Sequence, residues 1–218
     1  MQSIAAVAHL ALFARAPVPG QVKTRLTPAL GEVGACQLHT RLVEHALHRL
    51  NGHDDIDLQL WLDAPAVGEP AAIVRHWQRD FSVASYYQCG DDLGERMQHA
   101  MATAVAAGAL AIVIGADCPG IDQHYVKGAI ELLAGCDVVL GPALDGGYVL
   151  VASRQIHEGL FSSVRWGSGD VLAQTVDNIA RLGLSHALLP PLADIDRPDD
   201  LALLSRYGIE LPVKVCLA

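Results

Sequence analysis

Apolar runs of strand length recur along the chain and are separated by segments with helical spacing. Residues 5–13 and 111–116 are almost uninterrupted apolar runs, which are typical of strands buried on both faces of a sheet. Residues 56–62 alternate apolar with polar or amphipathic side chains and predict another strand. Shorter strands are predicted at residues 81–88, 138–140, 148–151 and 186–189.

Helices are predicted between these strands, because apolar positions there recur every three or four residues. In residues 31–50 such positions form one predicted helix face: Leu38, Leu42, Ala46 and Leu50. Asp122 and Ser168 are expected to cap two later helices, and Pro198 is expected to begin the last one. The remaining helices are predicted around residues 75–79 and 93–108.

The alternation of strands and helices predicts the fold class. An α/β chain of this kind builds a mostly parallel sheet that helices cover on both faces, in three α/β/α layers. No linker-like segment divides the sequence, so we expect one domain over residues 1–218. In such sheets ligands bind beyond the carboxyl ends of the strands, and the unusual polar residues of this chain fall there.

Composition supports a large core and narrows the class of ligand. The chain has 218 residues, of which 51% are hydrophobic, and its mean hydropathy is +0.29. The net charge of −9 argues against a nucleic-acid-binding surface, which requires a basic face. A nucleotide is compatible with this charge, because a short basic loop can bind phosphate on an acidic protein.

Cysteine usage and the first apolar run bear on localisation. Five scattered cysteines without a C-x-x-C pair are typical of reduced thiols, so we expect a cytoplasmic protein. The run at residues 4–13 is shorter than the roughly 20 apolar residues that a membrane span needs. No basic residue precedes this run, and we therefore expect a buried strand there and no membrane span.

The loop after the first predicted strand, ARAPVPGQVKTR, combines prolines, a glycine and basic side chains. Lys23 is one of three lysines in the chain, and it stands here with Arg15 and Arg25. Backbone N–H groups around Gly20, together with such cations, suit the oxygens of a nucleoside di- or triphosphate. The alternative is a solvated turn whose cations pair with surface carboxylates. A Walker A loop is excluded, because that motif requires glycine where Val22 stands.

A carboxylate follows the strand predicted at residues 111–116. Asp117, in the sequence IGADCPG, is placed to hold a divalent cation, since Mg²⁺ binds one or two carboxylates together with substrate phosphates. The alternative is that Asp117 caps the next helix, but Asp122 is better placed for that role. Cys118 is expected to be a small packing residue, because no activating base is identifiable.

Three further segments contribute candidate site residues. In LGPALDGGY, Asp145 precedes Gly146 and Gly147, where a sugar or an acceptor could approach the backbone, although Asp-Gly-Gly also forms ordinary hairpin turns. Asp196, in DIDRPDDL, is either a second metal ligand or part of a helix cap. Trp166 either stacks on a sugar ring or packs in the core.

Three histidines lie on the helix predicted at residues 31–50. Only His45 and His48 share a face of that helix, and no third ligand is identifiable. We therefore expect surface or partly buried histidines, His39 included, and no zinc site.

These motifs resemble, in the same order, those of the bacterial DUF2064 family. The segments that carry the resemblance are FARAPVPGQVKTRL, GDDLGERM, IGADCPG, LGPALDGGY and DIDRPDDL. They span nearly the whole chain. The resemblance implies a glycosyltransferase-like member of the nucleotide-diphospho-sugar transferase superfamily, with a GT-A-like fold. It is less specific for substrate, because that superfamily includes both sugar transferases and nucleotidyltransferases.

The resemblance also implies roles for individual residues. Those that match its nucleotide pocket are Ala14, Arg15, Gly20, Lys23 and Arg25. Its metal-bearing aspartate falls on Asp117. Many sugar transferases of this fold have a D-x-D signature, whereas this chain offers one acid there. A second ligand is then to be sought in Asp145 or Asp196.

The leading hypothesis from the sequence is a transferase that uses a nucleoside-diphosphate sugar. Mg²⁺ or Mn²⁺ at Asp117 would stabilise charge on the leaving diphosphate, while Lys23 and Arg25 bind the phosphates. Asp145 would orient the donor sugar or act as the base for the acceptor hydroxyl.

Two alternatives stay open at this stage. A nucleotidyltransferase would use a nucleoside triphosphate and a phosphorylated acceptor, and would release pyrophosphate. A non-catalytic protein that binds a nucleotide sugar is the other alternative, because fold alone does not determine function. A homodimer is one candidate assembly.

Overall fold

One seven-stranded sheet forms the centre of the structure, a computed structural model that describes residues 8–211. Its strand order is β3-β2-β1-β4-β6-β5-β7. The strands are β1 (Ala8–Ala14), β2 (Ile56–Leu62), β3 (Ala84–Tyr87), β4 (Leu110–Gly115), β5 (Val138–Pro142), β6 (Tyr148–Ser153) and β7 (His186–Leu188). Among the described residues, β6 runs antiparallel to its neighbours and the other pairings are parallel. The predicted α/β class with a mostly parallel sheet is therefore confirmed.

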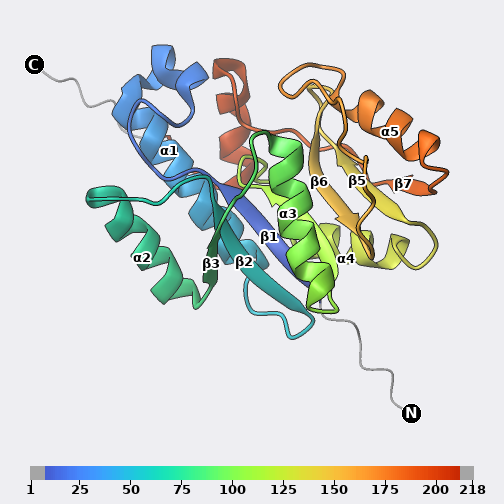
Figure 1. The fold of residues 1–218 in the computed structure, drawn as a ribbon. Coiled ribbons are helices and arrows are strands. Elements are labelled where there is room, and N and C mark those ends of the chain that lie inside the picture. Colours follow the sequence, from blue (N-terminus) through green and yellow to red (C-terminus); the bar gives the residue numbers. More distant parts are fainter. Residues whose placement is uncertain (1–7, 212–218) are drawn as a thin grey trace, which may run out of the picture.

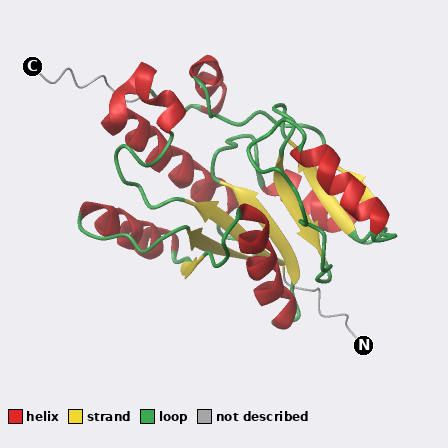
Figure 2. Ribbon diagram, turned by 45° about the horizontal axis from the view of Figure 1, so that its top comes forward, coloured by secondary structure: helices red, strands yellow, loops and turns green. Residues whose placement is uncertain are grey.

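Helices cover both faces of this sheet (Figure 1 and Figure 2). The α-helices are α1 (Thr27–Leu50), α2 (Glu69–Phe81), α3 (Leu93–Ala106), α4 (Gln123–Leu132) and α5 (Val171–Arg181). Two 3-10 helices, η1 (Thr24–Leu26) and η2 (Pro198–Tyr207), complete the described elements. Helices α1, α2 and α4 pack against one face through one hydrophobic cluster, and α3 and α5 pack against the other face through a second cluster. In the part of the chain that the structure describes, none of these helices is long and apolar enough to cross a membrane.

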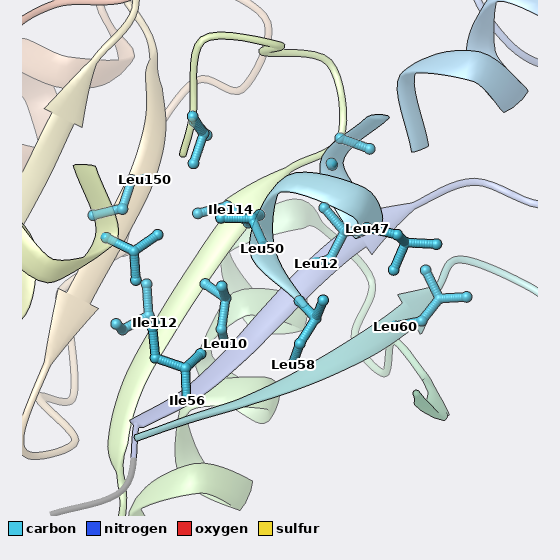
Figure 3. Packing of buried hydrophobic residues seen from close by; sticks show 14 of the residues in the cluster. Leu10, Leu12, Leu47, Leu50, Ile56, Leu58, Leu60, Ile112, Ile114 and Leu150 are labelled. Atoms are coloured by element: carbon cyan, nitrogen blue, oxygen red, sulfur yellow. The ribbon is translucent and has the colours of Figure 1, made fainter. Parts of the chain in front are cut away.

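The first cluster is built mainly from aliphatic side chains on neighbouring strands (Figure 3). Leu10 and Leu12 of β1 have no exposed surface, and they lie among side chains such as Leu58 of β2 and Ile112 of β4. Complete burial of one such side chain contributes about 1.5–3 kcal/mol. β1 has strands on both sides and helices over both faces, so it is enclosed within the sheet.

The order of the strands defines the point at which a ligand should bind. The chain passes from β1 to β2 and β3 on one side of the sheet, and then returns to place β4 on the other side of β1. Loops that follow β1 and β4 therefore diverge, and open α/β sheets bind ligands at such a switch point, beyond the carboxyl ends of the strands.

Several element boundaries differ from the sequence-based predictions, and two of them have a clear cause in the backbone. Phe81 ends α2 and does not begin a strand, because the chain turns at Ser82 with a φ of 52°, and β3 starts only at Ala84. Helix α1 begins at Thr27, before the predicted start, and includes a kink at Gly31 where φ is 72°. The first predicted strand holds for its described part; its residues 5–7 lie outside the described residues.

The predicted helix caps have different outcomes. Asp122 caps α4 as predicted, and its carboxylate accepts the N–H of Tyr125 at 2.9 Å. The prediction for Ser168 is wrong: Asp170 precedes α5, and the Ser168 hydroxyl donates to the Arg165 carbonyl instead. Two glycines flank Ser168, and the chain makes an additional turn there before the helix starts.

A third hydrophobic cluster joins the first loop to the C-terminal part of the chain. Its members are Leu26, Ala35, Leu38, Leu42, Ile195, Leu204 and Ile209. Because Leu26 and Ile195 both lack exposed surface, the segments on either side of them are held close together. This packing brings the loop after β1 next to the segment that precedes η2.

Candidate functional site

Lys23 joins the loop after β1 to two later loops. Its side chain is only 3% exposed, and its Nζ atom lies 2.9 Å from a carboxylate oxygen of Asp117. The same ammonium donates to the Ile195 carbonyl at 2.5 Å and lies 3.9 Å from Asp196. Lys23 itself has a left-handed backbone with φ of 49°, which few non-glycine residues adopt. A buried ammonium is stable only when it is paired, and these contacts provide the pairing.

Asp196 pairs with the second cation of the loop. Its carboxylate accepts a hydrogen bond from Arg25, whose side chain is 57% exposed. Arg197, and not Asp196, is the N-cap of η2, and the Asp200 carboxylate in the first turn accepts the N–H groups of Asp196 at 2.9 Å and of Arg197 at 2.6 Å. Of the two alternatives for Asp196, the cap is therefore wrong, and its side chain faces the cations instead.

Asp117 lies where β4 ends, as the sequence predicts. Its backbone carbonyl accepts the Ile195 N–H at 2.9 Å, which fixes the later loop beside it. Burial by itself raises the pKa of the Asp117 carboxyl, but the charge and hydrogen bond of Lys23 outweigh it, so the pKa lies below its ordinary value. The side chain is 48% exposed, so Asp117 is an ionised carboxylate that remains open to a ligand.

The remaining residues of the predicted nucleotide pocket lie at the end of β1 and in the loop that follows it, outside this ion-pair group. Ala14 is buried at the end of β1, and Gly20 is exposed with a φ of 76°. The Arg15 side chain is 67% exposed, lies 4.0 Å from Asp63 and donates to the Gln21 carbonyl at 3.2 Å. Arg15 is therefore held at the surface by these two contacts, beside the ion-pair group but not in it.

A cavity of about 230 Å³ opens beside Asp117, at the carboxyl ends of β1 and β4. Asp145 and Gly147, from the turn between β5 and β6, line it together with Trp166. Lys23 and Arg25 are not among its lining residues. The structure thus brings the acids and Trp166 together around a cavity and keeps the cations at its side.

The two glycines after Asp145 have different surroundings. Gly147 lines the cavity, and its N–H donates to the Asp145 carboxylate at 2.9 Å. Gly146 has a φ of 91°, and a Cβ at this position would collide with the Gly169 carbonyl. The close approach that requires glycine at position 146 is therefore made by the chain itself, at the turn before α5.

Trp166 packs among aromatic side chains, as one of its two predicted roles requires, and it also borders the cavity. It lines the cavity, and its ring also contacts Tyr148 and Phe161, with ring centroids 6.4 and 6.2 Å apart. Cys118 is 3% exposed, and burial raises the pKa of its thiol to about 12. Cys118 therefore remains a neutral thiol, as its predicted packing role requires. Cys216 lies outside the described residues.

Three residues at the site escape the sequence patterns. Asp63 follows β2, and its carboxylate accepts the Ala16 N–H at 2.9 Å. Asp194 lines the cavity; burial and the nearby Asp145 carboxylate raise its pKa above the ordinary value. Asp63 carries a usable signal, since an acid directly after a strand falls at the ligand-binding edge of the sheet.

His39 is the third such residue, and the expectation of a surface or partly buried position for it is wrong. It is 4% exposed on α1, and its Nε2 lies 2.9 Å from the Arg15 carbonyl. A carbonyl only accepts, so Nε2 carries the proton of this hydrogen bond. His45 and His48, on the same helix, are half-buried and exposed as expected. Helical spacing places His39 on the core face of α1. The sequence does not indicate, however, that a histidine there forms a hydrogen bond with the loop after β1.

Asp117 and Asp196 are the residues at the switch point that could hold a divalent cation shared with substrate phosphates. Among the described residues, no group of three or more His, Cys, Asp or Glu side chains gathers closely enough to hold a metal alone. Asp117 and Asp196 both approach Lys23, however, and Mg²⁺ requires only one or two protein carboxylates when phosphates supply further oxygens. Oxygen ligands of this kind suit Mg²⁺ or Mn²⁺.

The fold is that of transferases that act on nucleotides. The chain is 32% identical to a proposed nucleotide-diphospho-sugar transferase from Desulfovibrio desulfuricans G20, with a TM-score of 0.82 over 92% of this chain and 87% of that one. A cytidylyltransferase from Leptospira borgpetersenii serovar Hardjo-bovis matches with 14% identity and a TM-score of 0.55, over 96% and 81% of the two chains. The inositol-1-phosphate CTP transferase from T. maritima matches with 11% identity and a TM-score of 0.56, over 95% and 99%.

The sequence narrows this class to one family. DUF2064, described as "Uncharacterized protein conserved in bacteria", matches residues 37–168. The chain belongs to the DUF2064 family, which confirms the resemblance drawn from its motifs. No curated protein sequence matches the chain significantly.

Proposed function

We propose that this protein is a metal-dependent glycosyltransferase that takes a nucleoside-diphosphate sugar as donor and transfers the sugar to a hydroxyl acceptor. The observation that carries this proposal is the pairing of Lys23 with Asp117 beside a cavity at the switch point of the sheet. Cationic side chains that can bind phosphate lie there beside carboxylates that can bind a metal ion or accept a proton. The Desulfovibrio relative supports the donor class.

The balance of charge supports a divalent cation in this site. Four carboxylates lie near two cations in this site. The carboxylates are those of Asp117, Asp145, Asp194 and Asp196, and the cations are Lys23 and Arg25. The formal excess is two negative charges (4 − 2), which would repel a diphosphate. Asp117 and Asp196 would hold Mg²⁺ or Mn²⁺ together with the donor phosphates. When bound, such an ion supplies positive charge that stabilises the leaving diphosphate.

The residues of the chain then have distinct tasks. Lys23 and Arg25 bind the donor phosphates and offset the charge that develops on them. Asp145 accepts the proton of the acceptor hydroxyl as the hydroxyl oxygen forms its bond to the anomeric carbon of the sugar. The bond between that carbon and the diphosphate oxygen breaks, and the nucleoside diphosphate leaves with the electron pair. Trp166 and Gly147, which line the cavity, face the sugar or the acceptor.

Nucleotidyl transfer is the second candidate, because the cytidylyltransferases have the same fold. That reaction requires a phosphorylated acceptor, and phosphate is bound by Lys, Arg or backbone N–H groups. Among the described residues that line the cavity there is no Lys, Arg or His, and three carboxylates are present: Asp117, Asp145 and Asp194. This lining favours sugar transfer over nucleotidyl transfer.

A thermal-shift screen with Mn²⁺ tests the donor, using nucleoside-diphosphate sugars and nucleoside triphosphates as probes. A ligand at 100 times its Kd stabilises the native state by about 2.7 kcal/mol, which is readily detected. We expect a nucleotide sugar to stabilise the protein in Mn²⁺ and to lose this effect in EDTA. Turnover should release a nucleoside diphosphate; release of pyrophosphate from a triphosphate would select nucleotidyl transfer instead.

Asp117→Ala tests the assignment of the site. We expect this variant to lose metal-dependent binding of the nucleotide sugar and to lose turnover. Asp170→Ala is the matched control, because Asp170 also pairs with an arginine, Arg165, but lies on the exposed turn before α5. Intact binding and turnover in Asp117→Ala would show that the metal and phosphates bind elsewhere.

A further inference from the structure

The interior of the cavity beside Asp117 is apolar, whereas its charged groups are all negative. Phe13 of β1, Val113 of β4 and Val151 of β6 contribute to its wall. Met97 of α3 and Val171 of α5 also line it, so both helices of that face close around it. A wall of this kind favours an apolar molecule, because burying apolar surface is favourable and unpaired polar groups are costly to bury.

The carboxylates around this cavity are only partly matched by cations. Lys23 pairs with Asp117, but Asp145 and Asp194 form no ion pair within the described part of the chain. A second anion in the cavity would lie beside these like charges, and like charges a few ångström apart repel each other strongly where little water screens them. The cavity therefore selects against phosphate and carboxylate groups.

The size of the cavity limits the occupant further. Its volume of about 230 Å³ is below the roughly 300–1,000 Å³ of pockets that take drug-sized ligands. Gly115, at the end of β4, also lines the cavity, and a Cβ there would meet no atom within 4 Å. A side chain at position 115 would thus extend into open space.

We propose that this cavity binds the acceptor of the transfer reaction, and that the acceptor is a small molecule with an apolar body, a hydroxyl group and no phosphate or carboxylate. Its body lies among the side chains of β4, β6 and α3, and its hydroxyl faces Asp145 at the mouth. The role as acceptor rests on the proposed transferase reaction; the charge and polarity of the ligand rest on the lining of the cavity alone.

Two probes of nearly equal size test the proposal: 1,4-benzenedimethanol, which is neutral, and 4-(hydroxymethyl)benzoate, which is an anion. Their dissociation constants are measured by NMR titration of the full-length protein. We expect the neutral probe to bind at least about tenfold more tightly, given the repulsion by Asp145 and Asp194. Asp194→Asn should narrow this ratio. Equal or tighter binding of the anion would overturn the proposal.

Gly115→Val tests the location. We expect it to weaken binding of the neutral probe at least tenfold, because the new side chain occupies the cavity. Gly135→Val is the matched control: Gly135 lies in the exposed turn after α4, and a Cβ there meets only one backbone oxygen, at 3.9 Å. Unchanged binding in Gly115→Val, with a far-UV spectrum like that of the wild type, would overturn the assignment to this cavity.

The thermal shift with nucleotide sugars, measured on the same samples, keeps the two proposals apart. We expect Gly115→Val to retain this shift, because the donor phosphates bind at Lys23 and Arg25, which do not line the cavity. Probe binding without any nucleotide-sugar effect would support the proposed ligand class and overturn the transferase reaction. A nucleotide-sugar effect without probe binding would overturn the acceptor proposal alone.

Discussion

At the level of single residues, Lys23 connects segments that lie far apart in the sequence. Its ammonium contacts Asp117, after β4, and the Ile195 carbonyl, before η2. The sequence predicts a cation for this loop, but the 3% exposure of Lys23 and its left-handed backbone appear only in the folded structure, where Leu26 and Ile195 share one hydrophobic cluster. These contacts fix the position of the Lys23 ammonium between the two later loops.

The first prediction concerns this ion pair. Asp117→Asn removes the negative charge beside a buried ammonium, and we expect it to lower the free energy of unfolding by about 1–2 kcal/mol. This is the lower part of the range for bonds to charged groups, since the Asp117 side chain is 48% exposed. Urea unfolding measures the change. Asp170→Asn, in the exposed pair with Arg165, should cost less than about 1 kcal/mol. Equal losses of stability in the two variants would show that the burial of Lys23 adds nothing to the strength of its ion pair.

The second prediction concerns pH. Burial lowers the pKa of His39, and this outweighs the attraction of Asp117 and the hydrogen bond to the Arg15 carbonyl. Since the unfolded chain binds this proton more readily, near the ordinary pKa of about 6.5, the stability from His39 is present above that pH. It is lost as the pH falls toward the folded pKa, by at most about 1.4 kcal/mol per pH unit.

The charged groups that act on His39 are Asp117 and Asp63, which raise its pKa, and Lys23, which lowers it. His39→Gln removes the titrating group, so its free energy of unfolding should fall less than that of the wild type between about pH 7 and 5. Urea unfolding across this range measures the difference. His48→Gln, at an exposed position of α1, should keep the wild-type dependence. Parallel curves for His39→Gln and wild type would contradict the prediction.

At the level of elements, the turn between β5 and β6 shows how two loops fix one another. Gly146 lies against Gly169, and the Gly146 carbonyl accepts the N–H of Leu172 at 2.9 Å, in the first turn of α5. The sequence pattern correctly indicates a turn at Asp-Gly-Gly. It does not indicate that α5 begins beside this turn, because nothing local in the sequence records which distant backbone will approach a glycine.

The third prediction follows from this contact. In Gly146→Ala the new methyl group would collide with the Gly169 backbone, and the residue would also keep a positive φ of 91°. We expect the free energy of unfolding to fall by about 3 kcal/mol or more, because the collision adds to the cost of the unusual backbone conformation. Gly167→Ala is the control: its φ is 79° with no atom within 4 Å of the new Cβ, so it should cost about 1–2 kcal/mol. Thermal unfolding measures both; equal losses would refute the role of the contact.

At the level of the whole molecule, β1 links the two halves of the sheet. The loop with Lys23 and Arg25 follows β1, whereas Asp117 and Asp145 follow β4 and β5, and the cavity is lined from β1, β4 and β6. Both halves share the side chains of β1, so we expect them to fold as one unit. The packing of both halves on β1 is therefore a physical reason to expect a single domain.

The fourth prediction tests that unity. Leu12 is fully buried in β1, and Leu12→Ala should destabilise the protein by about 2–5 kcal/mol. Trp77 in α2 and Trp166 beside the cavity report on opposite halves. In variants whose only tryptophan is Trp77 or Trp166, the fluorescence transition should coincide with the far-UV transition. Leu12→Ala should shift both transitions together. A shift of one half alone would show two independent units.

Local pattern by itself determined much of this protein. Alternating apolar runs and helical faces gave the α/β class, the position of most strands, and the placement of Lys23, Asp117 and Asp145 after buried strands, because periodicity and burial are properties of neighbouring residues. The tertiary structure decided what these residues face. It buried Lys23 against Ile195, turned Asp196 toward Arg25, and enclosed a cavity between β4, β6 and α3. Such contacts arise from long-range packing, and no segment encodes them alone.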